Sequence, residues 1–200
     1  MSEPLDLLVT PFVRVSEVDA RALAALFDAC HCPCFCRYWH FAGNKNDWLY
    51  RCSAEPDASR DALVSAAQVG SDEARGVVAR LGDAIVGWMK LTPAPAVRKL
   101  YEQRYYRGLP GLAGDGVMAI GCTLVHPAHR RGGVTTALVR GAVSAARAWG
   151  ASAIEAFPRE VSAEVSDEEL WMGPSGAYAR AGFVPYAGES PYPVMRLSLL

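Results

Sequence analysis

The sequence predicts a single domain over residues 1–200, of the α/β class, with helices on both faces of its sheet. Three observations point to this class. The chain has 200 residues, 51% of them hydrophobic, which is enough for one sizeable core. Two strand-like runs at 76–80 and 84–91 flank a Gly-Asp turn and predict a hairpin. From residue 117 onward, strand-like and helix-like segments alternate, which is typical of a sheet covered on both sides.

The elements before residue 117 are assigned from capping residues and periodicity. Residues 7–15 alternate between apolar and polar side chains and predict a first strand. Ser16 is expected to cap a helix that continues to Phe27, because acidic residues follow it in the first turn. A second helix is expected over residues 57–70. Residues 96–106 have a helical composition and predict a third.

The elements after residue 117 alternate in type. Residues 117–125 predict a buried strand, and residues 134–149 an amphipathic helix. A strand over 153–157, a short helix over 173–181 and a final strand over 194–199 complete the chain. This order places a strand-to-helix junction between residues 125 and 134.

Composition and charge exclude several classes of protein. The formal net charge is −1, whereas nucleic-acid-binding domains usually carry a marked basic excess. No apolar run approaches the roughly 18–20 residues that span a bilayer. Residues 1–4 lack the features of a signal peptide. We therefore expect a cytoplasmic protein that binds neither nucleic acid nor membranes.

Cysteines are concentrated near the N-terminus. Four of the six alternate, and the full set is Cys30, Cys32, Cys34, Cys36, Cys52 and Cys122. Zinc is one interpretation, because His31 and His40 lie close by in the sequence. The spacing differs from the paired Cys-x-x-Cys of structural zinc sites, and a reducing cytosol favours free thiols. We expect no metal, and thiols that are buried or line a pocket.

The junction between the strand at 117–125 and the helix at 134–149 has the composition of an anion site. It contains Arg130, Arg131, Gly132 and Gly133. A helix N-terminus leaves backbone N–H groups unpaired and carries a partial positive charge. The alternative is an ordinary turn with solvated arginines. The segment lacks the Gly-Lys-Ser/Thr of a P-loop and the three spaced glycines of a dinucleotide site. It predicts a ligand that carries phosphate.

Two motifs resemble those of one family. Residues 130–135 (Arg-Arg-Gly-Gly-Val-Thr) are similar to the Gln/Arg-x-x-Gly-x-Gly/Ala signature of the GNAT superfamily of acyl-CoA N-acyltransferases. Residues 178–183 resemble its later Tyr-x-x-x-Gly-Phe element, about forty residues on and in the family's order. Thr135 departs from the usual Gly or Ala. The Cys/Trp-rich N-terminal segment is similar to that of uncharacterised bacterial members.

The resemblance implies a mixed central sheet that splays between its fourth and fifth strands. It also implies acetyl-CoA as co-substrate. The pantetheine arm would lie along the fourth strand, on backbone groups of Thr123, Leu124 and Val125. The pyrophosphate would meet the backbone N–H groups of Arg130, Arg131, Gly132, Gly133, Val134, Thr135 and Thr136. Since dimers are common in the family, we expect a monomer or a homodimer.

Two residues are candidates for proton transfer. By resemblance, Tyr178 is the general acid that protonates the leaving thiolate; otherwise it is a packing residue. Glu155 lies in an otherwise apolar strand. Its carboxylate either points into the cleft with a raised pKa, as a general base, or lies on the exposed side. Many family members use a water relay instead of a dedicated base.

Acceptor binding is expected from the aromatic segment before residue 50. Tyr38, Trp39 and Trp48 could form an apolar or cation–π wall for an amine, or could fill the core. The sequence thus predicts transfer of an acetyl group from acetyl-CoA to a primary amine of a small molecule, by direct attack in a ternary complex. Two alternatives stay open, a protein N-terminus or lysine as acceptor, and a sensor that binds acyl-CoA without turnover.

Overall fold

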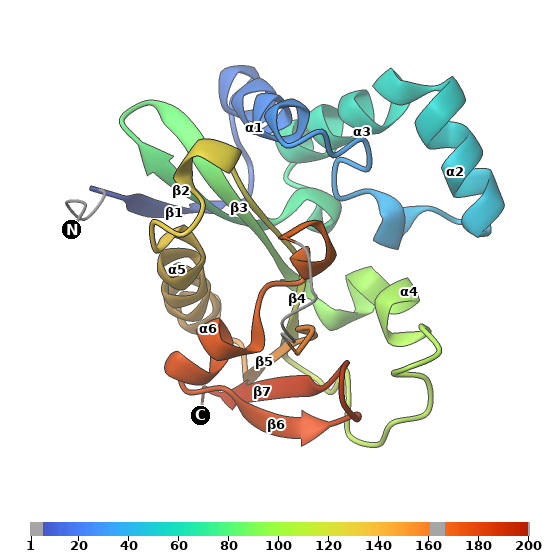
Figure 1. The fold of residues 1–200 in the computed structure, drawn as a ribbon, viewed down its shortest axis with the longest axis vertical. Coiled ribbons are helices and arrows are strands. Elements are labelled where there is room, and N and C mark those ends of the chain that lie inside the picture. Colours follow the sequence, from blue (N-terminus) through green and yellow to red (C-terminus); the bar gives the residue numbers. More distant parts are fainter. Residues whose placement is uncertain (1–5, 161–166, 200) are drawn as a thin grey trace.

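A seven-stranded mixed sheet organises the chain, in the order β1-β2-β3-β4-β5-β7-β6. We describe a computed structural model over residues 6–160 and 167–199 (Figure 1). The strands are β1 (Leu8–Phe12), β2 (Gly76–Leu81), β3 (Ala84–Pro93), β4 (Val117–Val125), β5 (Ala153–Ala156), β6 (Val184–Ala187) and β7 (Val194–Ser198). The β4–β5 pair is parallel, and the neighbouring pairs are antiparallel. The predicted α/β class and mixed sheet are confirmed.

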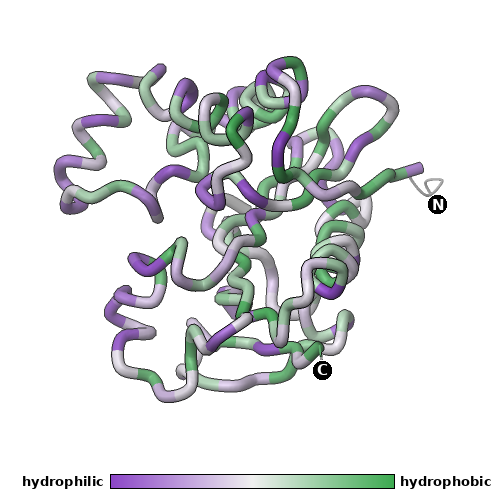
Figure 2. The backbone as a smooth tube through the Cα atoms, turned by 180° about the vertical axis from the view of Figure 1, so that it is seen from behind, coloured by the Kyte–Doolittle hydropathy of each residue, from purple (hydrophilic) through white to green (hydrophobic). Residues whose placement is uncertain are grey.

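Helices cover both faces of this sheet (Figure 1). They are α1 (Glu17–Ala29), α2 (Lys45–Ala54), α3 (Pro56–Val69), α4 (Arg98–Tyr101), α5 (Val134–Ala148) and α6 (Ser175–Arg180). One core packs Leu23 of α1 and Leu63 of α3 against Trp88 of β3. The other packs Leu138 of α5 against Ile154 of β5. Figure 2 shows hydrophobic and hydrophilic stretches alternating along the helices, as amphipathic packing requires. In the described part of the chain, no helix has the length and apolar character needed to cross a membrane.

The local signals read from the sequence explain most boundaries. Ser16 caps α1 by accepting a hydrogen bond from the backbone N–H of Asp19 at 3.1 Å, as predicted. The hairpin of β2 and β3 is confirmed. The helix predicted over residues 96–106 is wrong, since a 3₁₀ turn at Ala94–Val97 leads into a helix of only 4 residues. Strand β6 was not predicted.

The sheet splays between β4 and β5, as predicted. Among the described residues, β4 pairs with β5 only from Val117 to Ile120. The β3–β4 register shifts at the next position, so Gly121 forms a bulge. Beyond the bulge, β4 continues to Val125 against β3 alone. Beyond the bulge, the side of β4 that faces away from β3 pairs with no other described strand, and we call it the open edge.

Candidate functional site

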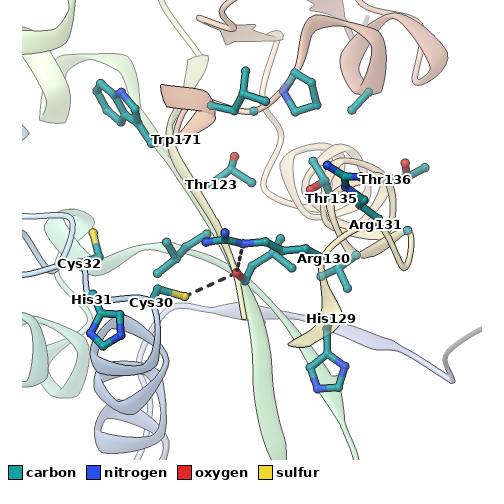
Figure 3. Close-up of a pocket in the computed structure, with 18 of the residues that line it drawn as sticks. Cys30, His31, Cys32, Thr123, His129, Arg130, Arg131, Thr135, Thr136 and Trp171 are labelled. Carbon is teal, nitrogen blue, oxygen red and sulfur yellow. Dashed lines mark hydrogen bonds between the residues drawn. The ribbon is translucent and has the colours of Figure 1, made fainter. Parts of the chain in front are cut away.

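A cavity of about 580 Å³ lies beside this open edge. Its walls come from four segments: the turn after α1, the end of β4, the start of α5, and the chain from Leu170 into α6 (Figure 3). The volume falls within the ~300–1,000 Å³ typical of ligand pockets. The predicted anion loop and the predicted pantetheine strand therefore border one cavity.

The start of α5 forms the cationic end of the cavity. Gly133 occupies the N-cap position at φ 83°, and in the described residues no side chain caps this helix. The first N–H groups of α5 therefore lack partners within the helix. A Cβ at Gly133 would meet no atom within 4 Å, so a phosphate has room to approach. Arg130, Arg131, Thr135 and Thr136 line the same end (Figure 3).

Val134 and Gly132, the other two predicted phosphate-binding residues, differ in their positions. Val134 lines the cavity and is 2% exposed, because it packs over Gly87 of β3 and so anchors the start of the helix. The N–H of Gly132 instead donates to the carbonyl of His129 at 3.4 Å. Gly132 does not line the cavity. The structure therefore does not bring Gly132 to the wall of the cavity, where the other six predicted loop residues lie.

The backbone of β4 presents alternate residues to the cavity. Leu124 is paired with Trp88, and its N–H and C=O turn toward β3, since adjacent residues of a strand face opposite ways. The predicted backbone role of Leu124 is corrected, although its side chain lines the cavity. The backbone groups of Thr123 and Val125 face the open edge. The carbonyl of Val125 accepts from Cys30 Sγ and from Arg130 Nε, both at 3.5 Å (Figure 3).

The open edge is covered by residues 170–174, which we call the strap. The N–H of Thr123 donates to the carbonyl of Trp171 at 2.7 Å. The Trp171 ring is 44% exposed and stacks on Trp39, with ring centroids 5.5 Å apart. Trp39 Nε1 in turn donates to the carbonyl of Gly121 at 2.6 Å. A ligand that pairs with the N–H of Thr123 must therefore displace the strap.

Tyr178 lies behind the cavity wall. Its side chain is fully buried, and its hydroxyl donates to the carbonyl of Met172 at 2.7 Å. The same hydroxyl lies 3.5 Å from Thr123 Oγ1, and Thr123 lines the cavity. Burial raises the pKa of Tyr178 above its usual value. The phenol therefore keeps its proton at neutral pH, one hydroxyl away from the cavity.

Glu155 is not placed as predicted. Its side chain is fully buried on β5 and does not line the cavity. The carboxylate accepts from the Tyr101 hydroxyl at 2.8 Å and from the N–H of Ala113 at 3.2 Å. It also forms an ion pair with Arg196 of β7 at 3.5 Å. These contacts tie three segments together, so the predicted role as general base is corrected to a structural one.

The predicted acceptor residues form a cluster beside the cavity instead of its wall. The Tyr38 ring lies 5.1 Å from Trp39 and 5.5 Å from Trp48, between ring centroids. Trp39 and Trp48 are 6% and 7% exposed, and none of the three lines the cavity. The ammonium of Lys99 lies 4.5 Å from the centre of the Tyr38 ring. The cation–π position is therefore filled by the protein's own lysine, and Trp39 reaches the cavity only through Trp171.

Comparison with known proteins identifies the family. The family model for the acetyltransferase (GNAT) family matches residues 38–165. The chain belongs to the GNAT acetyltransferase family. No curated protein sequence matches it.

Solved structures agree with this GNAT fold. A Desulfovibrio desulfuricans protein assigned to the GNAT family has a TM-score of 0.56 at 16% identity, over 97% of this chain and 99% of that one. A GNAT acetyltransferase of Brucella melitensis in complex with acetyl-CoA gives 0.50 at 15%, over 98% and 90%. An N-acetyltransferase of Thermoplasma acidophilum in complex with coenzyme A gives 0.53 at 8%, over 96% and 99%.

Several residues of this GNAT cavity were not predicted from the sequence. They are His31, His129 and Trp171, whereas Cys30 and Cys32 agree with the expectation of thiols that line a pocket. The alternating cysteines could be recognised in the sequence, but no local pattern showed that they would lie in the same cavity as residues 130–136. Trp171 gave no signal of its own. Across residues 6–160 and 167–199, no group of three or more His, Cys, Asp or Glu side chains is arranged to hold a metal ion.

The structural role of Glu155 predicts a stability effect. We expect Glu155→Gln to lower the free energy of unfolding by about 1.5–3 kcal/mol, since it removes the charged partner of Arg196. Urea unfolding measures this loss. Glu102→Gln is the matched control, because its ion pair with Arg98 is exposed, and we expect less than about 1 kcal/mol there. If Glu155→Gln abolished turnover while leaving stability intact, Glu155 would be the base after all.

Proposed function

We propose that this GNAT protein transfers the acetyl group of acetyl-CoA to a primary amine of a small molecule, by direct attack in a ternary complex. One observation carries the proposal: the uncapped N-terminus of α5, flanked by Arg130 and Arg131, opens into the same cavity as the open edge of β4. The family supports acetyl transfer. The Brucella and Thermoplasma structures, solved with acetyl-CoA and coenzyme A, support the donor.

The two halves of the cavity match the two halves of the donor. The pyrophosphate would accept hydrogen bonds from the first turn of α5 and from the two arginines. The amides of the pantetheine arm would pair with the backbone of Thr123 and Val125, as a strand added to a sheet edge. Apolar side chains of Leu124 and Val134 complete that wall.

The reaction needs an amine, a thioester and one proton donor. The neutral amine attacks the thioester carbonyl, the C–N bond forms, and the C–S bond breaks. We propose that, once displacement of the strap frees the Tyr178 hydroxyl from the Met172 carbonyl, Tyr178 protonates the departing thiolate through the Thr123 hydroxyl, the group that separates it from the cavity. Of the residues that the structure describes, no Asp or Glu lines the cavity. We therefore propose water, and not a carboxylate, as the acceptor for the proton that the amine loses.

Calorimetric titration with acetyl-CoA, followed by mass analysis with a panel of amines, tests this function. We expect binding, and loss of the acetyl group to one small amine. Peptides with a free N-terminus or a lysine form a second arm, and transfer to them alone would replace the small-molecule acceptor. Binding without acetyl loss to any acceptor would favour the sensor over the enzyme. Absence of binding would overturn the anion-loop argument.

Displacement of the strap gives a separate prediction. Removing the stacking of Trp171 on Trp39 destabilises the closed position by about 0.5–1.5 kcal/mol. We therefore expect Trp171→Ala to raise the affinity for acetyl-CoA about two- to tenfold, since less free energy opposes opening. Calorimetry measures this change. Tyr50→Ala is the control, because Tyr50 is an exposed aromatic residue on α2. Weaker binding by Trp171→Ala would show that the indole holds the ligand and does not block it.

A further inference from the structure

Two thiols in the cavity wall lie within contact distance of each other. Cys32 lines the cavity (Figure 3), and its Sγ lies 3.3 Å from the Sγ of Cys34. Both are free cysteines. A disulfide bond is about 2.05 Å long, so forming one would bring the two sulfurs about 1.2 Å closer together. The pair is thus close to the geometry of a disulfide at the surface of a ligand pocket.

The turn that carries this pair has a specified conformation. His31, Phe35 and Cys36 all adopt positive φ angles, of 51°, 44° and 57°. Residues other than glycine keep such angles only where the surrounding packing enforces them. Here the Phe35 ring is 3% exposed and stacks on Phe27 of α1, with centroids 5.4 Å apart. The packed turn therefore holds the two sulfurs together.

The two thiols differ in acidity. The hydrogen bond between the two thiols lowers the pKa of Cys32 and raises the pKa of Cys34 well above its usual value. The thiolate is the nucleophile in thiol–disulfide exchange. Cys32 thus combines the more acidic thiol with access to the cavity, and Cys34 stands behind it as the second thiol.

The remaining cysteines lack this combination. Cys30 lines the cavity, but its thiol donates to the Val125 carbonyl, and burial raises its pKa to about 11. Cys36 and Cys122 are 3% and 4% exposed. Cys52 lies on α2, outside the cavity, and burial raises the pKa of its thiol. Among the cysteines that the structure describes, only Cys32 and Cys34 therefore place a nucleophilic thiol at the cavity next to a second thiol that can form a disulfide with it.

We propose that Cys32 and Cys34 form a redox-active dithiol that reduces the disulfide of coenzyme A, with one coenzyme half bound in the cavity. The choice of coenzyme A rests on the proposed function, since Arg130 and Arg131 would hold its phosphates in the same cavity. The dithiol itself rests only on the sulfur geometry and the cavity.

The exchange takes two steps. The Cys32 thiolate attacks one sulfur of the bound disulfide, a mixed disulfide forms, and one coenzyme thiolate leaves. Cys34 then loses its proton and attacks the Cys32 sulfur, which forms the Cys32–Cys34 disulfide and releases the second thiolate. The two protons of the cysteines end on the two released thiols. The two cysteines together lose two electrons, and the coenzyme A disulfide gains them as it becomes two thiols.

The test uses the reduced full-length protein with coenzyme A disulfide or oxidised glutathione as probes. Remaining thiols are alkylated, and peptide mass analysis locates each bond. We expect a Cys32–Cys34 disulfide that dithiothreitol reverses, with two thiols released for each disulfide consumed. We expect coenzyme A disulfide to react about tenfold faster than oxidised glutathione, because the cationic loop concentrates it. Equal rates would overturn the selection of coenzyme A.

Three variants sharpen the test. Cys34→Ser should stop at a mixed disulfide on Cys32, and Cys32→Ser should not react. Cys52→Ser is the matched control and should behave as the wild type. Oxidation of Cys32→Ser at the wild-type rate, or a mixed disulfide that persists in the wild type, would overturn the dithiol.

Acetyl-CoA titration of the same reduced sample separates the two proposals. Disulfide formation with oxidised glutathione but no acetyl-CoA binding would contradict the proposed function and support the dithiol. Acetyl-CoA binding without Cys32–Cys34 oxidation would do the reverse. If both proposals hold, acetyl-CoA should slow the oxidation of Cys32 at least tenfold when present in saturating excess.

Discussion

Replacing both Arg130 and Arg131 by alanine should weaken acetyl-CoA binding about 10- to 100-fold. Both side chains line the end of the cavity that holds the N-terminus of α5. A hydrogen bond between charged partners contributes about 1.5–3 kcal/mol, which is reduced where the group is exposed, as Arg131 is. The N–H groups of α5 remain in the variant, so we expect weakened binding and not complete loss. Calorimetric titration at two salt concentrations measures the change.

The salt dependence and a matched arginine make this test specific. Wild-type affinity should fall as salt rises, and the variant should respond less, because it has fewer charges to screen. Arg147→Ala is the control, since Arg147 lies in the last turn of the same helix, outside the cavity. Equal affinities for the wild type and the double variant would mean that the phosphates bind elsewhere.

The features that could be predicted are those encoded within a few neighbouring residues. The cap at Ser16 and the Gly-Asp turn between β2 and β3 depend on local hydrogen bonding and backbone angles, and the structure shows both. The anion loop is also local, because a glycine at the N-cap and a following amphipathic helix suffice to create it. The separation of β4 from β5 was expected only from the family resemblance, because no local sequence pattern shows it.

The features that escaped depend on partners distant in the chain. Alternation could not decide which way Glu155 points, because its ion-pair partner Arg196 is supplied by β7. Nor could it show that Lys99 fills the cation position beside Tyr38. Strand β6 contains Pro185, which argues against a strand, yet the edge of a sheet tolerates proline. In each case tertiary contacts outweigh the local preference.

The splay and the strap together account for the position of Tyr178, the proposed acid, behind a threonine. The N–H of Thr123 is paired with the strap carbonyl, while its hydroxyl lies between the cavity and Tyr178. When a pantetheine arm replaces the strap on the strand edge, the acyl sulfur would lie beside that hydroxyl. Thr123 would then both align the donor through its backbone and pass the proton through its side chain.

Tyr178→Phe should therefore lower kcat about 100-fold, the scale of general acid catalysis, with the Kd for acetyl-CoA unchanged. The phenyl ring keeps the packing, and losing the hydrogen bond to Met172 should cost only about 0.5–1.5 kcal/mol of stability. Because burial raises the pKa of Tyr178, the wild-type acid stays protonated, and kcat should show no loss on its account as pH rises through the neutral range. Tyr186→Phe is the control, since its hydroxyl is bonded to Gly111 at 3.3 Å, away from the cavity.

A double-mutant cycle with Thr123→Val decides whether the two hydroxyls act in series. Valine keeps the shape and the backbone N–H of this position but removes the relay. If the proton passes through both groups, each single variant should lower kcat by a similar factor, and the double variant should be no slower than either one. If the two hydroxyls acted independently, the factors by which the single variants lower kcat would multiply in the double variant. An unchanged kcat in Tyr178→Phe would remove the tyrosine as the acid, and the Thr123 hydroxyl would then exchange protons with water in the cavity.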